Sequence, residues 1–493
     1  MPTTADSPTS DSTTDSTSAE GPADSSSPGT ARPPAAPEPA LPQGLKQRHL
    51  AMIALGGAIG AGLFVGSGVG IAAAGPAILL SYTAAGALVV LVMRMLAEMS
   101  AANPVTGSFA VHAARALGPW AGLTAGWLYW SLLVISVAAE AIGAADIMTG
   151  WVPGVPGWTW MTVFMAVFTV SNLGAVRHFG AVEFWFAGLK VTAICVFLLV
   201  GAAAVAGVLP GTKSPGAAHL TGDGGFMPQG WHGVGLGLVA AVFAYGGLET
   251  VTIAAAESSD PARAVGRAAR TVVWRVCVFY LGSMAVIVTL LPWDSPAVRG
   301  GPYAGALDQL GIPGAGHIMK AVVLIALLSA MNANVYASSR MLYALVGRGD
   351  APRPLGRLAA RGVPRNAVLA SSAFGFVAVV LDVLWPDTVF RQLLNAVGAT
   401  FLVIWFLVGL SQLRLRRRTE KEAPERLVIR MWLFPHLTRL ALCVIAAVLA
   451  LMVWDEGSRT QVLCTGVWTA FLVGCAGVRR LRAGTAGAGA GIS

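Results

Sequence analysis

Charged side chains are scarce in this sequence. Lysine, arginine, aspartate and glutamate together make up 12% of its 493 residues, whereas hydrophobic residues make up 55%. A soluble domain carries about 25% charged residues, and the mean hydropathy here is +0.67. This shortage of charge excludes an ordinary soluble domain and predicts a protein that crosses a membrane several times.

Motifs for covalent chemistry and for metal binding are also missing. The five cysteines stand singly, with no spacing typical of a metal site or a disulfide framework. None of the seven histidines opens an H-E-x-x-H zinc motif, and the chain has no G-x-x-x-x-G-K-[ST] nucleotide loop. A G-x-S-x-G nucleophile elbow is absent as well. We therefore expect no enzyme, no cofactor and no bound metal ion.

Long apolar runs are what the sequence has instead. A helix needs about 20 apolar residues to cross a bilayer, and these runs lack the alternation of a β-barrel. They predict an all-α integral membrane protein with about twelve transmembrane helices. The runs are 50–72, 76–97, 120–148, 158–176, 182–209, 232–256, 271–292, 317–344, 366–385, 390–412, 431–454 and 461–478.

The two ends of the chain differ from the apolar part. Residues 1–43 are rich in Ser, Thr, Pro, Ala and Asp, and such a segment cannot bury enough surface to offset its ordering entropy. It also lacks the basic start and apolar core of a signal peptide. We predict a disordered cytoplasmic tail over 1–43, a membrane domain over 44–482 and a flexible C-terminal tail over 483–493.

Basic residues alternate between the two sides of the predicted membrane. They concentrate in every second loop, as in LRLRRRTEK at 413–421, and are few in the loops between. By the positive-inside rule, this pattern places both termini in the cytoplasm. The net charge of +9 thus reflects membrane topology, and it forms no basic patch for a nucleic acid.

Glycines crowd the first apolar run, in the stretch GGAIGAGLFVGSG from Gly56 to Gly68. Each costs a helix interior about 1 kcal/mol relative to alanine. A dinucleotide loop would need a preceding strand, which a membrane span does not offer. Close packing of small residues is one explanation. The other is a helix broken at mid-membrane, whose free backbone N–H groups can hold an anion.

The sixth run supports the broken helix. It reads GLVAAVFAYGGLETVTIAAAES, with Gly246 and Gly247 at its middle and Glu249 just beyond. Secondary transporters pair two broken spans at corresponding positions of an inverted repeat. Breaks in spans one and six predict repeats of five spans, about 50–209 and 232–412, followed by two extra helices at about 431–478.

Several stretches resemble one family. They are LKQRHLAMIALGGAIGAGLFVGSG, AGPAILLSY, RMLAEMS, GWLYW, GGFMPQG, ETVTIAAAESSDPARA, ASSRMLYALVGRGDAP and RMWLFPHLT. The chain resembles the amino acid transporter branch of the amino acid–polyamine–organocation superfamily, and within it the bacterial GABA permeases. The resemblance runs from about Leu45 to Arg482, and it implies an amino acid permease with an inverted five-plus-five core.

The resemblance also implies a binding site between the two breaks. The amides of Ala61 and Gly62, with Gly60 shaping the turn, would hold the substrate carboxylate. The substrate ammonium would donate hydrogen bonds to the carbonyls of Ala58, Phe243 and Gly246. The Phe243 ring would act as a gate over the bound substrate. Side chains of helices three, six, eight and ten would set specificity. The implied binding residues are Ala58, Ile59, Gly60, Ala61, Gly62, Phe243, Ala244, Tyr245, Gly246, Asn332 and Asn395.

Ionisable residues inside membrane spans are functional candidates. Lys190 either snorkels to the cytoplasmic face or, as the resemblance implies, takes the place of a sodium ion and exchanges a proton. Glu249 either couples to protons or is a protonated carboxyl that holds the break. Glu140 either lines the substrate pocket, pairs with a cation, or has a structural role.

The expected function is import of GABA or a related small amino acid across the cytoplasmic membrane, by proton symport and alternating access. H+ is the expected driving ion, and the lipid bilayer is the other expected partner. An exchanger, or a symporter for proline or an aromatic amino acid, stays open. A channel would want charged rings or a carbonyl filter, and a nutrient receptor would want a signalling domain; the sequence shows neither.

Overall fold

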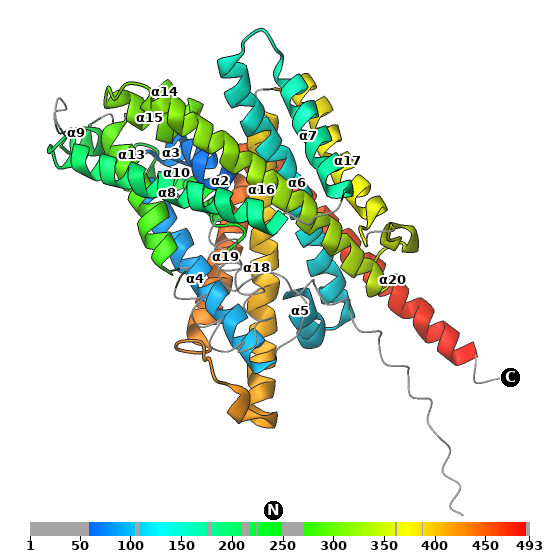
Figure 1. Ribbon diagram of the computed structural model, residues 1–493. Helices are drawn as coiled ribbons and strands as arrows, with labels where there is room; N and C mark the ends of the chain where they lie inside the picture. The colour runs from blue at the N-terminus through cyan, green and yellow to red at the C-terminus, as the bar shows by residue number, and fades with distance from the viewer. Residues whose placement is uncertain are drawn as a thin grey trace, which may run out of the picture. The chain divides into compact units, whose positions relative to one another are not determined.

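The computed structural model describes residues 59–103, 109–174, 179–209, 214, 216–222, 224–248, 271, 273–359, 362–386 and 388–489. By its internal contacts the chain divides into two units, Met1–Gln43 and Gly44–Ser493. The first unit, which is the predicted tail, lies outside the described residues. Within the described part of the second unit every regular element is a helix (Figure 1), which confirms the all-α prediction.

Helices follow one another with short connections. The first half contains α2 (Ala61–Phe64), α3 (Gly66–Ala74), η1 (Gly75–Ala77), α4 (Ile78–Ala102), α5 (Phe109–Leu117), α6 (Pro119–Trp151), α7 (Gly157–Leu173), α8 (Phe179–Val205), α9 (Ala218–Thr221) and α10 (Gly230–Ala244). The second half contains η2 (Val276–Leu281, a π-helical turn), α13 (Gly282–Leu290), α14 (Pro296–Gly300), α15 (Pro302–Gln309), α16 (Ala315–Gly347), η3 (Arg353–Gly356), α17 (Arg365–Leu384), α18 (Val389–Glu422), η4 (Pro424–Arg426), α19 (His436–Trp454) and α20 (Glu456–Gly489).

The described residues contain nine helical stretches long and apolar enough to cross a membrane. One of them, Ala61–Ala102, contains the second part of the first predicted run and the whole of the next run. Helix α7 has 17 residues and α10 has 15, so at about 1.5 Å per residue each is shorter than the hydrocarbon core of about 30 Å. A multi-pass membrane protein is confirmed, whereas the count of twelve spans and the inverted repeat stay predictions.

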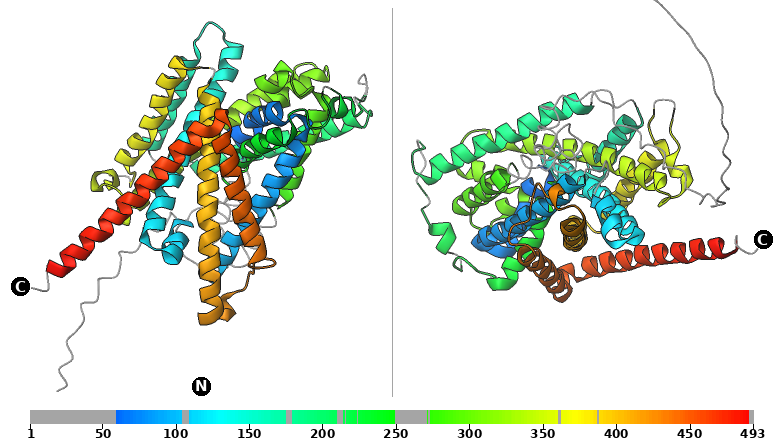
Figure 2. Two further views of the ribbon diagram at one scale, coloured as in Figure 1. Left: turned by 180° about the vertical axis from the view of Figure 1, so that it is seen from behind. Right: turned by 90° about the horizontal axis from the view of Figure 1, so that it is seen from below.

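Helix α6 lies at the centre of the described bundle. It packs along α16, and it also contacts α5, α7, α17, α18 and α20, as the two views of Figure 2 allow the reader to follow. Small side chains permit the close approach: the β-carbon position of Gly143 lies 3.4 Å from the Leu327 side chain of α16. Side chains of α6 and α16 can therefore meet in the bundle interior, where the candidate site lies.

A buried polar network fastens the end of α4 to α18. Glu98 is 2% exposed and accepts hydrogen bonds from Arg416 and from the backbone N–H of Met431. Gln412 donates to the other oxygen of Glu98 at 2.7 Å, and Thr438 donates to Gln412. The stretches RMLAEMS and RMWLFPHLT, more than 300 residues apart, are thus joined by one satisfied carboxylate.

Large apolar side chains remain exposed on the last two helices. Trp454 of α19 is 84% exposed, and Val467 and Phe471 of α20 are 71% and 57% exposed. In water such a surface would drive association, whereas lipid tails are as apolar as these side chains. The exposed apolar faces are those expected of helices that face lipid.

Candidate functional site

The first predicted helix interruption falls at Ile59 and Gly60, where the described residues of this span begin. Gly60 has an extended backbone, with φ −142° and ψ −150°, and helix α2 begins at Ala61. The first hydrogen bond back into the turn is donated by Phe64 to the Gly60 carbonyl at 3.3 Å. The amides of Ala61 and Gly62 therefore precede the first intrahelical donor, as at any helix start, and form a site with partial positive charge.

The second interruption follows the end of α10. Tyr245 donates to the Ala241 carbonyl at 3.0 Å, and Gly246 donates to the Phe243 carbonyl at 3.1 Å, so the helix closes in a tight turn. Gly247 has φ +88°, a left-handed conformation that glycine adopts without strain. The helix thus ends where the sequence predicts the break of span six; residues 249–270 lie outside the described residues, so the break itself stays a prediction. Carbonyl groups at this helix end supply partial negative charge.

The two interruptions touch each other. A β-carbon on Gly62 would lie 2.6 Å from the Ala244 Cα and 2.9 Å from the Phe243 carbonyl oxygen. Only glycine allows this approach, which brings the start of α2 against the end of α10. Close packing, one of the two explanations of the glycines, therefore applies at Gly62, whereas the broken helix stays a prediction.

Glu140 of α6 lies beside the first interruption. It is 5% exposed, and its Oε1 is 3.2 Å from the β-carbon position of Gly60. Asn334 of α16 donates to both carboxylate oxygens at 3.1 Å. Ala330, one helical turn before Asn334, is also 3.2 Å from that β-carbon position. Helices α6 and α16 thus place a carboxylate and an amide against the break.

Lys190 lies inside the protein and forms an ion pair. Its side chain is fully buried, and its Nζ is 3.6 Å from Oε1 of Glu183, which is 2% exposed. Ser329 of α16 donates to the other oxygen of Glu183 at 2.7 Å. Snorkelling of Lys190 to the membrane surface, one of the two alternatives, is wrong. Electrostatic interactions connect Lys190 and Glu183 with Glu140.

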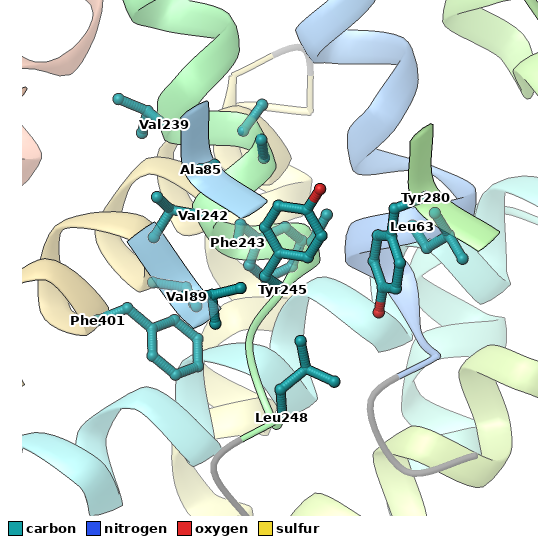
Figure 3. Close-up of a cluster of buried hydrophobic side chains, with 14 of the residues drawn as sticks. Leu63, Ala85, Val89, Val239, Val242, Phe243, Tyr245, Leu248, Tyr280 and Phe401 are labelled. Atoms are coloured by element: carbon teal, nitrogen blue, oxygen red, sulfur yellow. The ribbon is translucent and has the colours of Figure 1, made fainter. Parts of the chain in front are cut away.

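Aromatic side chains close the region around the end of α10. Figure 3 shows Phe243 and Tyr245 among apolar side chains such as Leu63 and Phe401. The Phe243 ring lies over α3, with Cδ1 3.1 Å from the β-carbon position of Gly66. Phe243 is therefore positioned where the predicted gating ring would stand.

Tyr245 faces away from the interruption. Its hydroxyl donates to the Tyr82 carbonyl of α4 at 2.9 Å, and its ring packs on Tyr82 and Tyr280 at centroid distances of 5.6 and 4.7 Å. Tyr245 therefore connects the end of α10 to α4. The space next to Gly246 is taken by Phe401, whose ring carbon lies 2.2 Å from the β-carbon position.

Two predicted binding residues have partners elsewhere. Asn332 accepts a hydrogen bond at 2.9 Å from Asn172 of α7. Its position is about 200° around α16 from Ala330 at 100° per residue, so Asn334 and not Asn332 shares the face toward the break. Asn395 donates to the Gly457 carbonyl at the start of α20, at 3.3 Å.

The remaining predicted residues divide into two groups. Ile59, Ala61 and Ala244 are buried at the interruptions, whereas Ala58 and Glu249 lie outside the described residues. The sequence reasoning missed Glu183 and Asn334. Glu183 had a signal, because a spacing of seven residues places it on the Lys190 face of a helix.

Metal-ligand clusters of three or more His, Cys, Asp or Glu side chains do not occur within the described ranges. The chemistry of the described site is therefore that of backbone amides and carbonyls, two carboxylates and one ammonium group. Such a set can bind a small zwitterion and can hold or release protons.

Comparison with known proteins finds amino acid permeases and transport proteins among the relatives of this chain. The gamma-aminobutyric acid permease of Bacillus subtilis is 46% identical over 433 residues, covering 88% of this chain and 92% of the relative. The gamma-aminobutyric acid permease of Escherichia coli is 44% identical over 425 residues, covering 86% and 91%. The aromatic amino acid transport protein AroP of Corynebacterium glutamicum is 48% identical over 437 residues, covering 88% and 94%.

The family match covers nearly the whole membrane domain. Residues 49–474 match the amino acid permease family, which includes both helix interruptions and the Lys190 region. Together with the identities above and the multi-pass helical fold, this match shows that the chain belongs to the amino acid permease family of the amino acid–polyamine–organocation superfamily.

Proposed function

We propose that this chain imports a small amino acid, GABA or a near relative, across the cytoplasmic membrane by proton symport. The observation that carries the proposal is the contact between the two helix interruptions, with Gly62 of α2 against Phe243 and Ala244 of α10. Amide donors and carbonyl acceptors then face one small volume. The two ends of an amino acid require this arrangement.

The substrate carboxylate binds at the start of α2. The amides of Ala61 and Gly62 donate to it, and the helix dipole favours its negative charge. The ammonium group binds at the carbonyls of Ala58, Phe243 and Gly246, with the Glu140 carboxylate nearby. A zwitterion that leaves water needs both ends satisfied, because an unpaired buried charge costs several kcal/mol.

Alternating access uses the same interruptions. A non-helical segment such as Ile59–Gly60 can change its backbone angles while the helices on either side stay rigid. Transport in this scheme opens the site to one side of the membrane and then to the other, with both termini in the cytoplasm as the arginine distribution predicts. Lys190 carries the coupled proton, so the driving ion is H+.

Energetics allow strong accumulation by a single proton. A gradient of one pH unit supplies about 1.4 kcal/mol, and a potential of 100 mV supplies about 2.3 kcal/mol per charge. Their sum of about 3.7 kcal/mol corresponds to a concentration ratio of a few hundredfold for a neutral zwitterion. A ratio near one would instead be typical of exchange.

An aromatic amino acid is the second candidate substrate. The Corynebacterium glutamicum aromatic transporter is 48% identical to this chain, slightly more than the GABA permeases at 46% and 44%. Both substrates share the carboxylate and ammonium groups that the interruptions would bind. They differ in the space needed beyond those groups.

The test is uptake into proteoliposomes with an inward proton gradient. Labelled GABA, proline, phenylalanine and lysine are supplied one at a time, with and without a protonophore. We expect GABA or a small relative to accumulate and the accumulation to collapse with the protonophore. Uptake only into vesicles preloaded with amino acid would make the protein an exchanger, and accumulation of phenylalanine alone would select the aromatic substrate.

A further inference from the structure

Glu183 is a buried carboxylate that the proposed function leaves unused. It lies near the start of α8, is 2% exposed, and precedes Lys190 by seven residues. Two helical turns separate the two side chains, so they project from one face of α8. A lone carboxylate is rarely buried to this extent unless it is paired.

Both oxygens of Glu183 have a distinct neighbour. Oε2 accepts a hydrogen bond from Ser329 of α16 at 2.7 Å. Oε1 faces the Lys190 ammonium at 3.6 Å, and the two side chains interact directly. The serine thus fixes one oxygen, and the other stays directed at the lysine.

Charge counting constrains how Lys190 can lose its proton. If Nζ alone became neutral, the Glu183 carboxylate would be left buried without its cation. Removing one partner of a buried ion pair costs about 3–5 kcal/mol. Release of the proton from Lys190 is therefore favourable only if the negative charge of Glu183 disappears in the same step.

We infer that Glu183 is the immediate proton partner of Lys190 in coupling, with Ser329 as the residue that orients it. This inference rests on the proposed proton symport. In the step, the Nζ–H bond breaks, its electron pair stays on nitrogen, and an O–H bond forms at Oε1. The pair changes from ammonium and carboxylate to amine and carboxylic acid, and its net charge stays zero.

Other titratable groups stand on the described helices around this pair. Helix α8 packs against α13, α15, α16 and η2, and Glu140 of α6 interacts with both members of the pair. Helix η2 carries Cys277 and Tyr280, α15 carries Tyr303 and Asp308, and α13 carries no titratable side chain. On α16, the titratable residues closest in sequence to Ser329 are Tyr336, Lys320 and Arg340, at 7, 9 and 11 residues, about 10, 14 and 17 Å along the helix; His317 and Tyr343 are 12 and 14 residues away.

The experiment compares Glu183→Gln with the wild-type chain in two transport modes. Gradient-driven accumulation requires net proton movement, whereas exchange of labelled for unlabelled substrate at equal pH on both sides does not. Glu422→Gln is the matched control, because it removes one carboxylate from an exposed ion pair with Arg418. Ser329→Ala tests the orienting hydroxyl.

We expect Glu183→Gln to lower the accumulation ratio to about one while exchange stays within about threefold of wild type. The pH dependence of exchange flattens in this variant, and Glu183→Asp restores part of the accumulation. Ser329→Ala reduces accumulation several-fold, and Glu422→Gln changes neither mode.

A double variant tests whether the effect of Glu183→Gln comes from misfolding around an unpaired Lys190. Glu183→Gln with Lys190→Gln removes both charges, so it leaves no unpaired buried ammonium; we expect it to exchange and not to accumulate. Wild-type accumulation and pH dependence in Glu183→Gln would overturn the inference alone, whereas accumulation by the double variant would also overturn the role of Lys190 in the proposed symport. A wild-type chain that exchanges without accumulating in a proton gradient would overturn the proposed symport itself.

Discussion

Replacing Gly62 by alanine tests the contact on which the proposed site depends. The added β-carbon would lie 2.6 Å from the Ala244 Cα, whereas ordinary contact begins at 3.4 Å, so α2 and α10 would have to separate by about 0.8 Å. The nearest atoms are backbone atoms of Phe243 and Ala244, which cannot rotate out of the way. The added methyl group would therefore displace the start of α2 from the end of α10.

The expected loss of affinity follows from hydrogen-bond geometry. An N–H···O distance of about 2.9 Å that lengthens by about 0.8 Å exceeds the usual limit of about 3.2 Å. A hydrogen bond to a charged group contributes about 1.5–3 kcal/mol. Loss of one such bond to the substrate carboxylate therefore weakens binding by about 10- to 150-fold.

The assay is substrate affinity of the purified variant, with its thermal midpoint measured alongside. Gly143→Ala is the buried control, because its β-carbon would be 3.4 Å from the flexible Leu327 side chain and should change affinity less than about threefold. If Gly62→Ala binds substrate with wild-type affinity, the amides at the start of α2 do not hold the carboxylate. A larger replacement, Gly62→Leu, should abolish uptake while the protein still inserts.

Three further changes probe other parts of the molecule. Lys190→Ala should abolish proton-driven accumulation and leave exchange, measured in the same vesicles; unchanged accumulation would reduce Lys190 to a structural residue. Gly246→Ala places a β-carbon 2.2 Å from the Phe401 ring, so it should lower uptake at least tenfold, and adding Phe401→Leu should restore it; failure of the second change to rescue would refute the steric reason. His112 of α5 lies outside the membrane-spanning segments, and burial lowers its pKa to about 4, so the unfolded chain binds more protons between about pH 6.5 and pH 4. The thermal midpoint should therefore fall as the pH drops through that range, and His112→Gln should flatten the curve; parallel curves would contradict the assignment.

Local features of the sequence predicted the positions of both interruptions. Gly60 and Gly246 mark them because glycine changes backbone preference wherever it stands, independently of its neighbours in space. The apolar runs likewise predicted the helices, since each needs about 20 apolar residues whatever it packs against. Both kinds of signal lie within one segment and can be read from it.

Helix phase and pairing were harder to predict. Asn332 was chosen as a binding residue, but it bonds to Asn172 of α7, and Asn334, two residues later, meets Glu140. Two residues change the direction of a side chain on a helix by about 200°. Which face of α16 points toward the break depends on how α16 packs along α6. The sequence of α16 by itself does not specify this packing.

The sequence by itself determined that the chain is a helical membrane protein and that a lysine stands inside a span, and it predicted where two helices would break. Hydropathy, glycine content and an isolated charge are properties of single segments. Only the tertiary structure decided that Gly62 lies against Phe243 and Ala244, and that Lys190 is paired with Glu183, which accepts a hydrogen bond from Ser329. Those contacts join residues of different helices, and close packing of the whole bundle decides which side chains meet.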